Sequence, residues 1–363
     1  LPVWLQAAGY YTSHIGKYLG GYGQETSQTL VPPGWTNWQG LVDPSTYKLY
    51  DYTINDNGTL VRYGTATEDY QTDVLADRAV ETIDEAALSG QPFFLSIAPV
   101  PPNEERDQAG NRSGPRPAPR HVGAFGNEPL PKPPSFNESD VSDKPSFIRK
   151  LPRLSSSQIQ NITRSYRDRL ASLLAVDDLV ERVVDQLSAA GVLDNTVLIF
   201  TSDNGWFMGE HRIASGHNQV YEEAIRVPLL IRSGSGGSGA TTNQFVSNVD
   251  LAPTIVDLAN ATAGLPMDGQ SLVPWVSNPG NVSARTLLIE APGFKAVRNR
   301  NYVYVEHNSG ARELYDMRQG TTNYDPYQLR SRHAASGYSQ ARSQLATKLN
   351  QLRNCAGSNC IVP

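Results

Sequence analysis

The chain has 363 residues, of which 39% are hydrophobic, and a formal net charge of −5 from 31 Lys+Arg and 36 Asp+Glu. Its length predicts two or three domains with a sizeable core. The mild negative charge and the lack of a basic run exclude nucleic acid as the main partner. No apolar stretch reaches the roughly 18 residues that a bilayer crossing needs. The composition therefore indicates a loop-rich globular protein without a membrane span.

The first ninety residues predict a helix, a hairpin and a second helix. Residues 1–6 contain neither an initiator methionine nor a signal peptide and read as a helix already under way, so we expect the chain to begin inside a domain. A turn is expected around Gly16. Residues 45–63 predict a β-hairpin whose turn is Asn57-Gly58. Apolar residues at helical spacing predict an amphipathic helix over residues 67–88.

The middle of the chain alternates strands and helices. Residues 93–98 predict a short buried strand, and residues 99–154, rich in Pro, Gly and charge, predict a loop at the rim of an active site. A long helix is expected over residues 158–190. Residues 196–201 then predict a β-branched strand buried on both faces, and residues 227–232 predict a further strand.

The last part of the chain has a different pattern. Residues 285–320 alternate as antiparallel strands do, and residues 335–353 predict a closing helix. The order of elements predicts the α/β fold class, with a mixed, mostly parallel sheet flanked by helices in a domain over residues 1–284. A smaller C-terminal α+β domain with an antiparallel sheet is expected over residues 285–363.

Cysteines and glycosylation sequons bear on the compartment. Cys355 and Cys360 lie in a Gly/Ser/Asn turn, and because no second pair completes four metal ligands, they predict a local disulfide. So short a loop stabilises a fold by only roughly 2 kcal/mol. Six Asn-x-Ser/Thr sequons with a disulfide predict secretion, although sequons also arise by chance. The six are Asn57, Asn111, Asn137, Asn161, Asn260 and Asn281.

One predicted strand ends in oxygen-bearing side chains. Asp203, Asn204 and Gly205 follow the strand over residues 196–201. In open α/β sheets ligands bind beyond the carboxyl ends of strands, and Asp203 and Asn204 offer hard oxygen ligands to Ca²⁺ or Mg²⁺. The alternative is a plain Asp-Asn-Gly turn, and this motif alone leaves both interpretations open.

Two basic side chains are candidates for contact with an anion. Lys17 follows Gly16, and its ammonium group can approach an oxyanion closely. His217 lies in a polar loop before the strand at residues 227–232 and can serve as a proton donor. Taken singly, each is better explained as a solvated surface residue.

Together these segments resemble one family, the type I sulfatases of the alkaline-phosphatase superfamily. Residues 9–17 match G-Y-x-T-x-x-x-G-K, residues 201–205 match T-S-D-N-G, and residues 221–228 match Y-E-E-x-I-R-V-P. Further matches lie at residues 248–254, 267–269 and 313–316 and at the terminal cysteine pair. The pattern is most similar to secreted fungal and plant arylsulfatases and to N-acetylglucosamine-6-sulfatase.

The resemblance implies roles for particular residues. Asp203 and Asn204 match two ligands of the family's metal, Ca²⁺ or alternatively Mg²⁺. Lys17 matches the lysine that contacts the sulfate, which makes Lys17 and His217 the catalytic candidates in this chain. Lys17, Asn103 and His217 are the sulfate-binding candidates, with Asn103 standing where the family has a histidine and His217 where it usually has a lysine. Leu19 stands where many members have histidine.

The family's nucleophile has no counterpart in this sequence. It is a cysteine oxidised to formylglycine within C-x-P/A-x-R, and the 363 residues contain no such motif. The resemblance implies that this cysteine and two aspartate ligands lie upstream of Leu1. We therefore expect the 363 residues alone to be inactive.

The implied function is hydrolysis of a sulfate ester of a small molecule or sugar, in the secreted fraction or the secretory lumen, lysosome or vacuole included. We expect Asp203 and Asn204 to point into a cleft near Lys17 and His217. One alternative is a non-catalytic sulfatase-like binding protein, which would explain Asn103 and His217. Another is a phosphomonoester or phosphonate hydrolase on the same fold.

Overall fold

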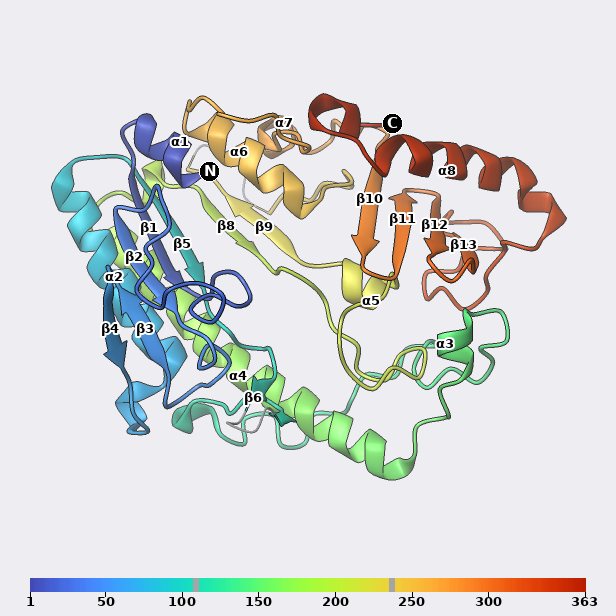
Figure 1. Ribbon diagram of the computed structural model, residues 1–363, viewed down its shortest axis with the longest axis horizontal. Helices are drawn as coiled ribbons and strands as arrows, with labels where there is room; N and C mark the ends of the chain where they lie inside the picture. The colour runs from blue at the N-terminus through green and yellow to red at the C-terminus, as the bar shows by residue number, and fades with distance from the viewer. Residues whose placement is uncertain (107–110, 235–238) are drawn as a thin grey trace. The chain divides into compact units, whose positions relative to one another are not determined.

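Two units make up the chain in the computed structural model, which describes residues 1–106, 111–234 and 239–363 (Figure 1). The first unit holds residues 1–130, 163–196 and 259–262, and the second holds residues 131–162, 197–258 and 263–363. The domain boundary expected after residue 284 lies inside the second unit and stays a prediction.

The first unit is built on a five-stranded sheet with the strand order β4-β3-β2-β1-β5. Strand β1 pairs in parallel with β2 and β5, whereas β3 pairs antiparallel with β2 and β4. The sheet is therefore mixed as predicted, but with two parallel and two antiparallel pairings it is not mostly parallel. Asn57 and Gly58 join β3 to β4 at φ 50° and 92°, which confirms the predicted turn. The strands are β1 (Tyr11–Gly16), β2 (Asn37–Leu41), β3 (Thr53–Asp56), β4 (Thr59–Arg62) and β5 (Phe93–Ala98).

Helices flank this sheet. The amphipathic helix α2 (Gln71–Ser89) confirms the predicted one and contacts β1 through a face that includes the buried Leu75 and Ile83. The short helix α1 (Pro2–Ala7) precedes β1, and the long helix α4 (Ser156–Ala189) belongs to this unit from residue 163 onward. The predicted rim loop is mostly irregular where it is described, with the short strands β6 (Glu105–Arg106) and β7 (Arg112–Ser113). Its residues 107–110 lie outside the described residues.

In the second unit, β8 (Leu198–Thr201) pairs antiparallel with β9 (Leu229–Arg232). The prediction that this strand is buried on both faces is wrong, since Phe200 is 44% exposed and its partner Leu230 is 60% exposed. Phe200 and Leu230 are register partners, so their side chains point to the same face of this two-stranded sheet, and the described residues leave that face partly uncovered. The helices of this part are α3 (Ser146–Arg149), α5 (Glu222–Ile225), α6 (Leu251–Leu258) and α7 (Val273–Ser277).

An antiparallel sheet closes the second unit, as predicted. Its four strands run in sequence order, β10 (Thr286–Ala291), β11 (Phe294–Asn299), β12 (Tyr302–His307) and β13 (Arg312–Asp316). Helix α8 (Ser339–Leu352) packs on it through Leu345, Leu349 and Leu352 (Figure 1). The predicted disulfide joins Cys355 to Cys360 directly after this helix. Across the described residues, we find no helix with the length and apolar character of a membrane span.

Candidate functional site

Lys17 lies directly after β1, at the carboxyl end of two parallel strands. Its backbone N–H donates to the carbonyl oxygen of Ala98, the last residue of β5, at 2.8 Å. Its Nζ lies 5.7 Å from the centre of the Tyr47 ring, within cation–π range. The β1 strand, which sequence patterns did not predict, thus fixes the backbone of Lys17 at the edge of the sheet where ligands bind in α/β proteins.

Asn103 follows β5, so it leaves the same end of the sheet as Lys17. Its N–H donates to the Val100 carbonyl oxygen at 2.9 Å, and its Oδ1 accepts the N–H of Glu104 at 2.7 Å. The side-chain oxygen therefore closes its own turn, and the amide nitrogen is the group of Asn103 that can donate to a sulfate oxygen. Leu19, the nearby departure from the family pattern, is 67% exposed.

Asp203 and Asn204 lie in the second unit, directly beyond β8. Asp203 is exposed, and its Oδ1 accepts the N–H of Asn204 at 2.9 Å. The Asn204 amide donates from Nδ2 to the Gly205 carbonyl oxygen at 2.9 Å, which leaves its oxygen as the group able to coordinate a cation. Gly205 packs so closely that a Cβ there would lie 2.1 Å from the Glu223 carbonyl oxygen. This glycine therefore allows the chain to turn directly after the two candidate ligands.

His217 lies on the same loop as these two residues, because the segment over residues 205–224 folds back on itself. The N–H groups of Gly205 and Trp206 donate to the carbonyl oxygens of Ala224 and Glu223, each at 2.8 Å. The half-buried His217 ring lies 5.5 Å from the Trp206 ring, centre to centre. The loop thus brings His217 next to the residue that follows Asn204 and Gly205.

A buried ion cluster holds the tip of this loop, and sequence analysis missed it. His211 is fully buried, and its Nδ1 lies 2.7 Å from Glu138 Oε2 while its Nε2 lies 3.7 Å from Glu223 Oε2. Burial alone lowers the pKa of His211, but the hydrogen bond to Glu138 and the attraction of the Glu223 carboxylate outweigh it, and the pKa is raised above its usual value. The ring also stacks on Tyr221 at 4.0 Å. This cluster ties the loop to α5 and to the segment around Glu138.

The side-chain oxygens of Asp203 and Asn204 fit part of a metal site. Ca²⁺ takes about six to eight oxygen ligands, and Asp203 and Asn204 offer two side-chain oxygens with one negative charge. No group of three or more His, Cys, Asp or Glu residues that could hold a metal ion occurs in the part of the chain that the structure describes. These two residues can supply a share of the ligands and not a complete shell.

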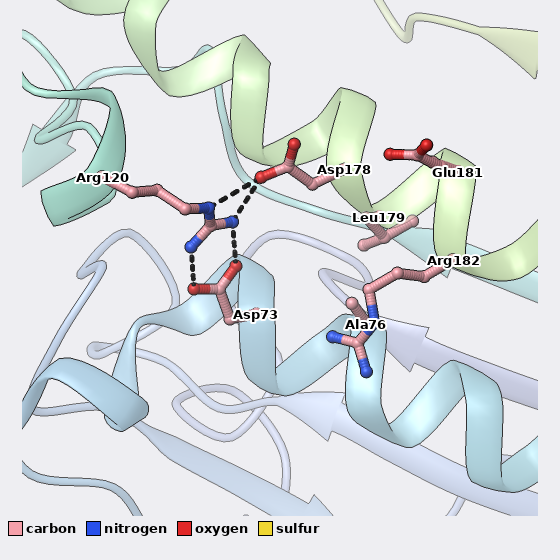
Figure 2. A pocket seen from close by; sticks show the side chains of 7 residues that line it. All are labelled: Asp73, Ala76, Arg120, Asp178, Leu179, Glu181 and Arg182. Atoms are coloured by element: carbon pink, nitrogen blue, oxygen red, sulfur yellow. Dashed lines mark hydrogen bonds and ion pairs between the residues drawn. The ribbon is translucent and has the colours of Figure 1, made fainter.

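A pocket of about 400 Å³ in the first unit lies between α2 and α4 (Figure 2). Arg120 reaches across it, with Nη1 2.6 Å from Asp73 and Nη2 2.6 Å from Asp178. None of the predicted site residues lines it. Because the charges are partly exposed and already paired, we interpret the pocket as a gap between two helices closed by surface ion pairs.

The sequons differ in accessibility. Five of the six asparagines are exposed, namely Asn57, Asn111, Asn161, Asn260 and Asn281. The structure argues against the sixth site, because Asn137 is only 8% exposed. Its Oδ1 accepts the N–H of Leu154 at 2.8 Å, and its Nδ2 donates to the carbonyl oxygen of the same residue at 3.3 Å. A glycan on this nitrogen would require the segment to open.

The predicted site residues therefore fall into two groups. Lys17 and Asn103 lie at one end of the sheet of the first unit, and Asp203, Asn204 and His217 lie on one loop of the second. The expected proximity of Lys17 to Asp203 stays a prediction. Sequence analysis also missed Arg106, whose guanidinium stacks on Tyr47. The Glu104-Glu105-Arg106 sequence gave no signal beyond an ordinary charged loop.

Comparisons with known proteins agree with these motifs. A family model described as "Sulfatase" matches residues 1–261, and one described as "N-sulphoglucosamine sulphohydrolase, C-terminal" matches residues 209–355. The arylsulfatase of Volvox carteri is 34% identical over 422 residues, covering 100% of this chain and 62% of that protein. Human N-acetylglucosamine-6-sulfatase is 37% identical over 290 residues, covering 78% of this chain and 50% of that protein.

The fold has matches among solved structures. That of BT4656 in complex with its substrate D-glucosamine-2-N,6-O-disulfate superimposes with a TM-score of 0.77 at 24% identity, covering 96% of this chain and 80% of that one. At this identity the likeness shows the shared fold alone. The present chain spans at most 62% of the length of the two curated relatives.

Proposed function

Because this chain belongs to the sulfatase family, we propose that its protein hydrolyses sulfate monoesters of small molecules or sugars, as arylsulfatases do. One observation supports this most directly. Both groups of candidate residues directly follow strand ends, Lys17 after β1 and Asp203 and Asn204 after β8. Strand ends of this kind are where α/β folds place their ligands.

Hydrolysis of a sulfate monoester requires positive charge around the sulfate and a proton for the leaving oxygen. In the proposed reaction the ammonium group of Lys17 stabilises the negative charge that develops on the sulfate oxygens. The amide nitrogen of Asn103 donates a hydrogen bond to the same group. His217, when protonated, donates its proton to the leaving oxygen. As in phosphoryl transfer, positioning and electrostatics carry most of the acceleration.

The proposed reaction also uses a divalent cation. Asp203 and Asn204 would hold Ca²⁺, or alternatively Mg²⁺, together with ligands from outside the described residues. When bound, such an ion supplies positive charge to the sulfate oxygens.

We place the nucleophile, a formylglycine, in a part of the protein outside these 363 residues. Both cysteines of the chain are joined in the Cys355–Cys360 disulfide, so neither is available as its precursor. We also propose a secreted or secretory-lumen location, lysosome or vacuole included. The disulfide and the five exposed sequons support it.

The test compares the full gene product with residues 1–363 alone, using 4-nitrophenyl sulfate and added Ca²⁺. We expect multiple turnovers from the full product and none from the 363 residues. In the full product, Lys17→Met should lower kcat/KM by about 100-fold, in line with the loss of one oxyanion-stabilising group. The matched control is Lys150→Met, at an exposed lysine of the second unit.

Two outcomes would contradict the proposal. Turnover by the pure 363-residue chain would place a nucleophile within it. A full product that binds sulfate esters without turning them over would favour the alternative, a non-catalytic binding protein.

A further inference from the structure

Residues 248–254 and 267–269 match the sulfatase pattern and have no part in the proposed reaction. In the second unit these two segments pack against each other. A Cβ on Gly269 would lie 2.1 Å from the Val249 carbonyl oxygen, so the approach requires a glycine at this position. The segments therefore form one block, and a side chain of this block contacts the turn that follows β8.

A buried ion pair holds the block together. Asp250 is fully buried and Arg285 is 5% exposed, and the two Nη atoms of the arginine donate to the two carboxylate oxygens, each at 2.6 Å. The backbone N–H groups of Ser247 and Gln270 donate to the same two oxygens at 2.7 and 2.9 Å. Four hydrogen bonds thus satisfy the carboxylate and fix the short 3₁₀-helix η4 (Asn248–Asp250) in place.

Asn248 reaches from η4 to the turn after β8. Its Nδ2 donates to the Asp203 carbonyl oxygen at 3.2 Å and lies 3.4 Å from the Ser202 carbonyl oxygen. The far side of the turn is fixed to α5, where the Gly205 N–H donates to a carbonyl oxygen at 2.8 Å. The bond between Asp203 Oδ1 and the Asn204 N–H is internal to the turn and shapes it without placing it in the unit. Asn248 therefore ties the Asp203 backbone to a buried, fully paired block.

This contact affects geometry more than folding. Asn248 is exposed, so its hydrogen bond replaces one to water and contributes little to the stability of the whole unit. Ca²⁺ binds its oxygen ligands at about 2.3–2.6 Å, so a displaced backbone at Asp203 would move the carboxylate out of range. Groups that orient metal ligands from behind typically change metal affinity by about 10- to 100-fold.

We propose that Asn248 is a positioning residue, whose amide holds the turn in the orientation in which the side-chain oxygens of Asp203 and Asn204 bind the divalent cation. This inference rests on the proposed function, which assigns the cation to these two residues. It deepens that function by giving residues 248–254 and 267–269 a task, which is to hold Asn248 in place.

The experiment follows the turn in the full gene product with and without metal. Hydrogen exchange measured by mass spectrometry reports on the amides of residues 202–206 in Ca²⁺-free protein, and calorimetric titration with CaCl₂ gives the Kd. In Asn248→Ala we expect about fivefold faster exchange in this peptide and an about tenfold higher Kd, at an unchanged midpoint of urea unfolding. The matched control Asn243→Ala, at an exposed asparagine of the preceding loop, should keep the wild-type values.

Asn248→Asp separates positioning from direct coordination. A carboxylate cannot donate a hydrogen bond, so a positioning role predicts faster exchange and weaker Ca²⁺ binding in this variant too. A lower Kd with wild-type exchange would make Asn248 a ligand and overturn the inference.

Three further outcomes decide the matter. Wild-type exchange or a wild-type Kd in Asn248→Ala overturns the inference. A lower unfolding midpoint with faster exchange throughout the second unit would indicate a general structural role and also overturns it. If the wild type binds neither Ca²⁺ nor Mg²⁺, the cation of the proposed function fails, whereas faster exchange of residues 202–206 in Asn248→Ala still supports the hold of Asn248 on the turn.

Discussion

Gly16, the last residue of β1 before Lys17, has a φ of 109°, a backbone conformation that residues with a Cβ rarely adopt. A Cβ at this position would also lie 2.3 Å from the carbonyl oxygen of Ala98, the last residue of β5. The same carbonyl accepts the Lys17 N–H. A single glycine therefore lets β1 end close enough to β5 for the lysine backbone to bond there.

We predict that Gly16→Ala destabilises the protein by roughly 2–4 kcal/mol, because the new methyl group combines a clash with a strained φ. Urea unfolding gives the free energy directly. The matched control is Gly20→Ala in the same segment, where a Cβ meets no atom within 4 Å and φ is not in the left-handed region. Equal stability of the two variants would contradict this account.

Residue identity also sets the charge of buried histidines. His14 of β1 is 4% exposed and stacks on Trp38 at 4.8 Å, with Trp35 and Tyr18 also in ring contact. Burial lowers the pKa of His14 to about 4, so the ring is neutral near pH 7. An uncharged aromatic side chain is what this apolar cluster accommodates.

At the scale of elements, the loop over residues 205–224 depends on contacts with a distant segment. At its tip, the N–H of His211 donates to the Ser135 carbonyl oxygen at 2.8 Å, and the Arg212 guanidinium donates to the carbonyl oxygens of Glu138, Ser139 and Leu151. Ser135 Oγ in turn donates to Glu223 Oε1 at 2.8 Å. The loop that carries His217 is therefore anchored at its tip and at α5.

The His211 cluster predicts a pH dependence of stability. The folded pKa of His211 is above the unfolded value near 6.5, so its contribution is fully present below pH 6.5 and is lost as pH rises through the folded pKa. Besides Glu138 and Glu223, the charged groups that face it are Lys144 and Glu210. Chemical unfolding of wild-type protein between pH 6 and 9 should show this fall.

His211→Gln tests the assignment. It removes the cation between Glu138 and Glu223 and leaves Lys144, 3.6 Å from Glu138, as the remaining positive charge, so we expect a loss of about 3 kcal/mol at pH 6 and a flatter profile above it. The control His333→Gln changes a histidine of the same unit whose pKa is lowered, so the fall above pH 6.5 should remain. A wild-type-like profile in His211→Gln would exclude His211 as its source.

At the scale of the whole molecule, the sequons predict a pattern of glycans. Expression in a secreting eukaryotic host followed by peptide mass spectrometry should find occupancy among the exposed sites and none at Asn137, whose amide nitrogen is bonded to the Leu154 carbonyl oxygen. Asn161, an exposed asparagine on α4, is the internal comparison. Full occupancy of Asn137 in folded protein would contradict the burial of this side chain.

Local patterns were sufficient for much of the fold. The Asn57-Gly58 turn was predicted from its residue types, because both positions need a positive φ. The amphipathic α2 and the alternating strands of the C-terminal sheet were predicted from spacing, since each buries one face with its own period. The patterns missed β1 and β2, in which polar residues such as Ser13, His14 and Asn37 are buried. A buried polar residue breaks the apolar pattern, and only its tertiary partners explain it.

The sequence by itself determined the family, the order of the main elements after residue 45 and the residues offered as ligands, because short motifs such as Thr201 to Gly205 carry their chemistry in consecutive positions. Only the tertiary structure decided which side chains act together. The pairing of Arg106 with Tyr47 and the ion pair of His211 with Glu138 join residues more than fifty positions apart. Such contacts depend on how strands and loops pack, and residue spacing along the chain does not predict them.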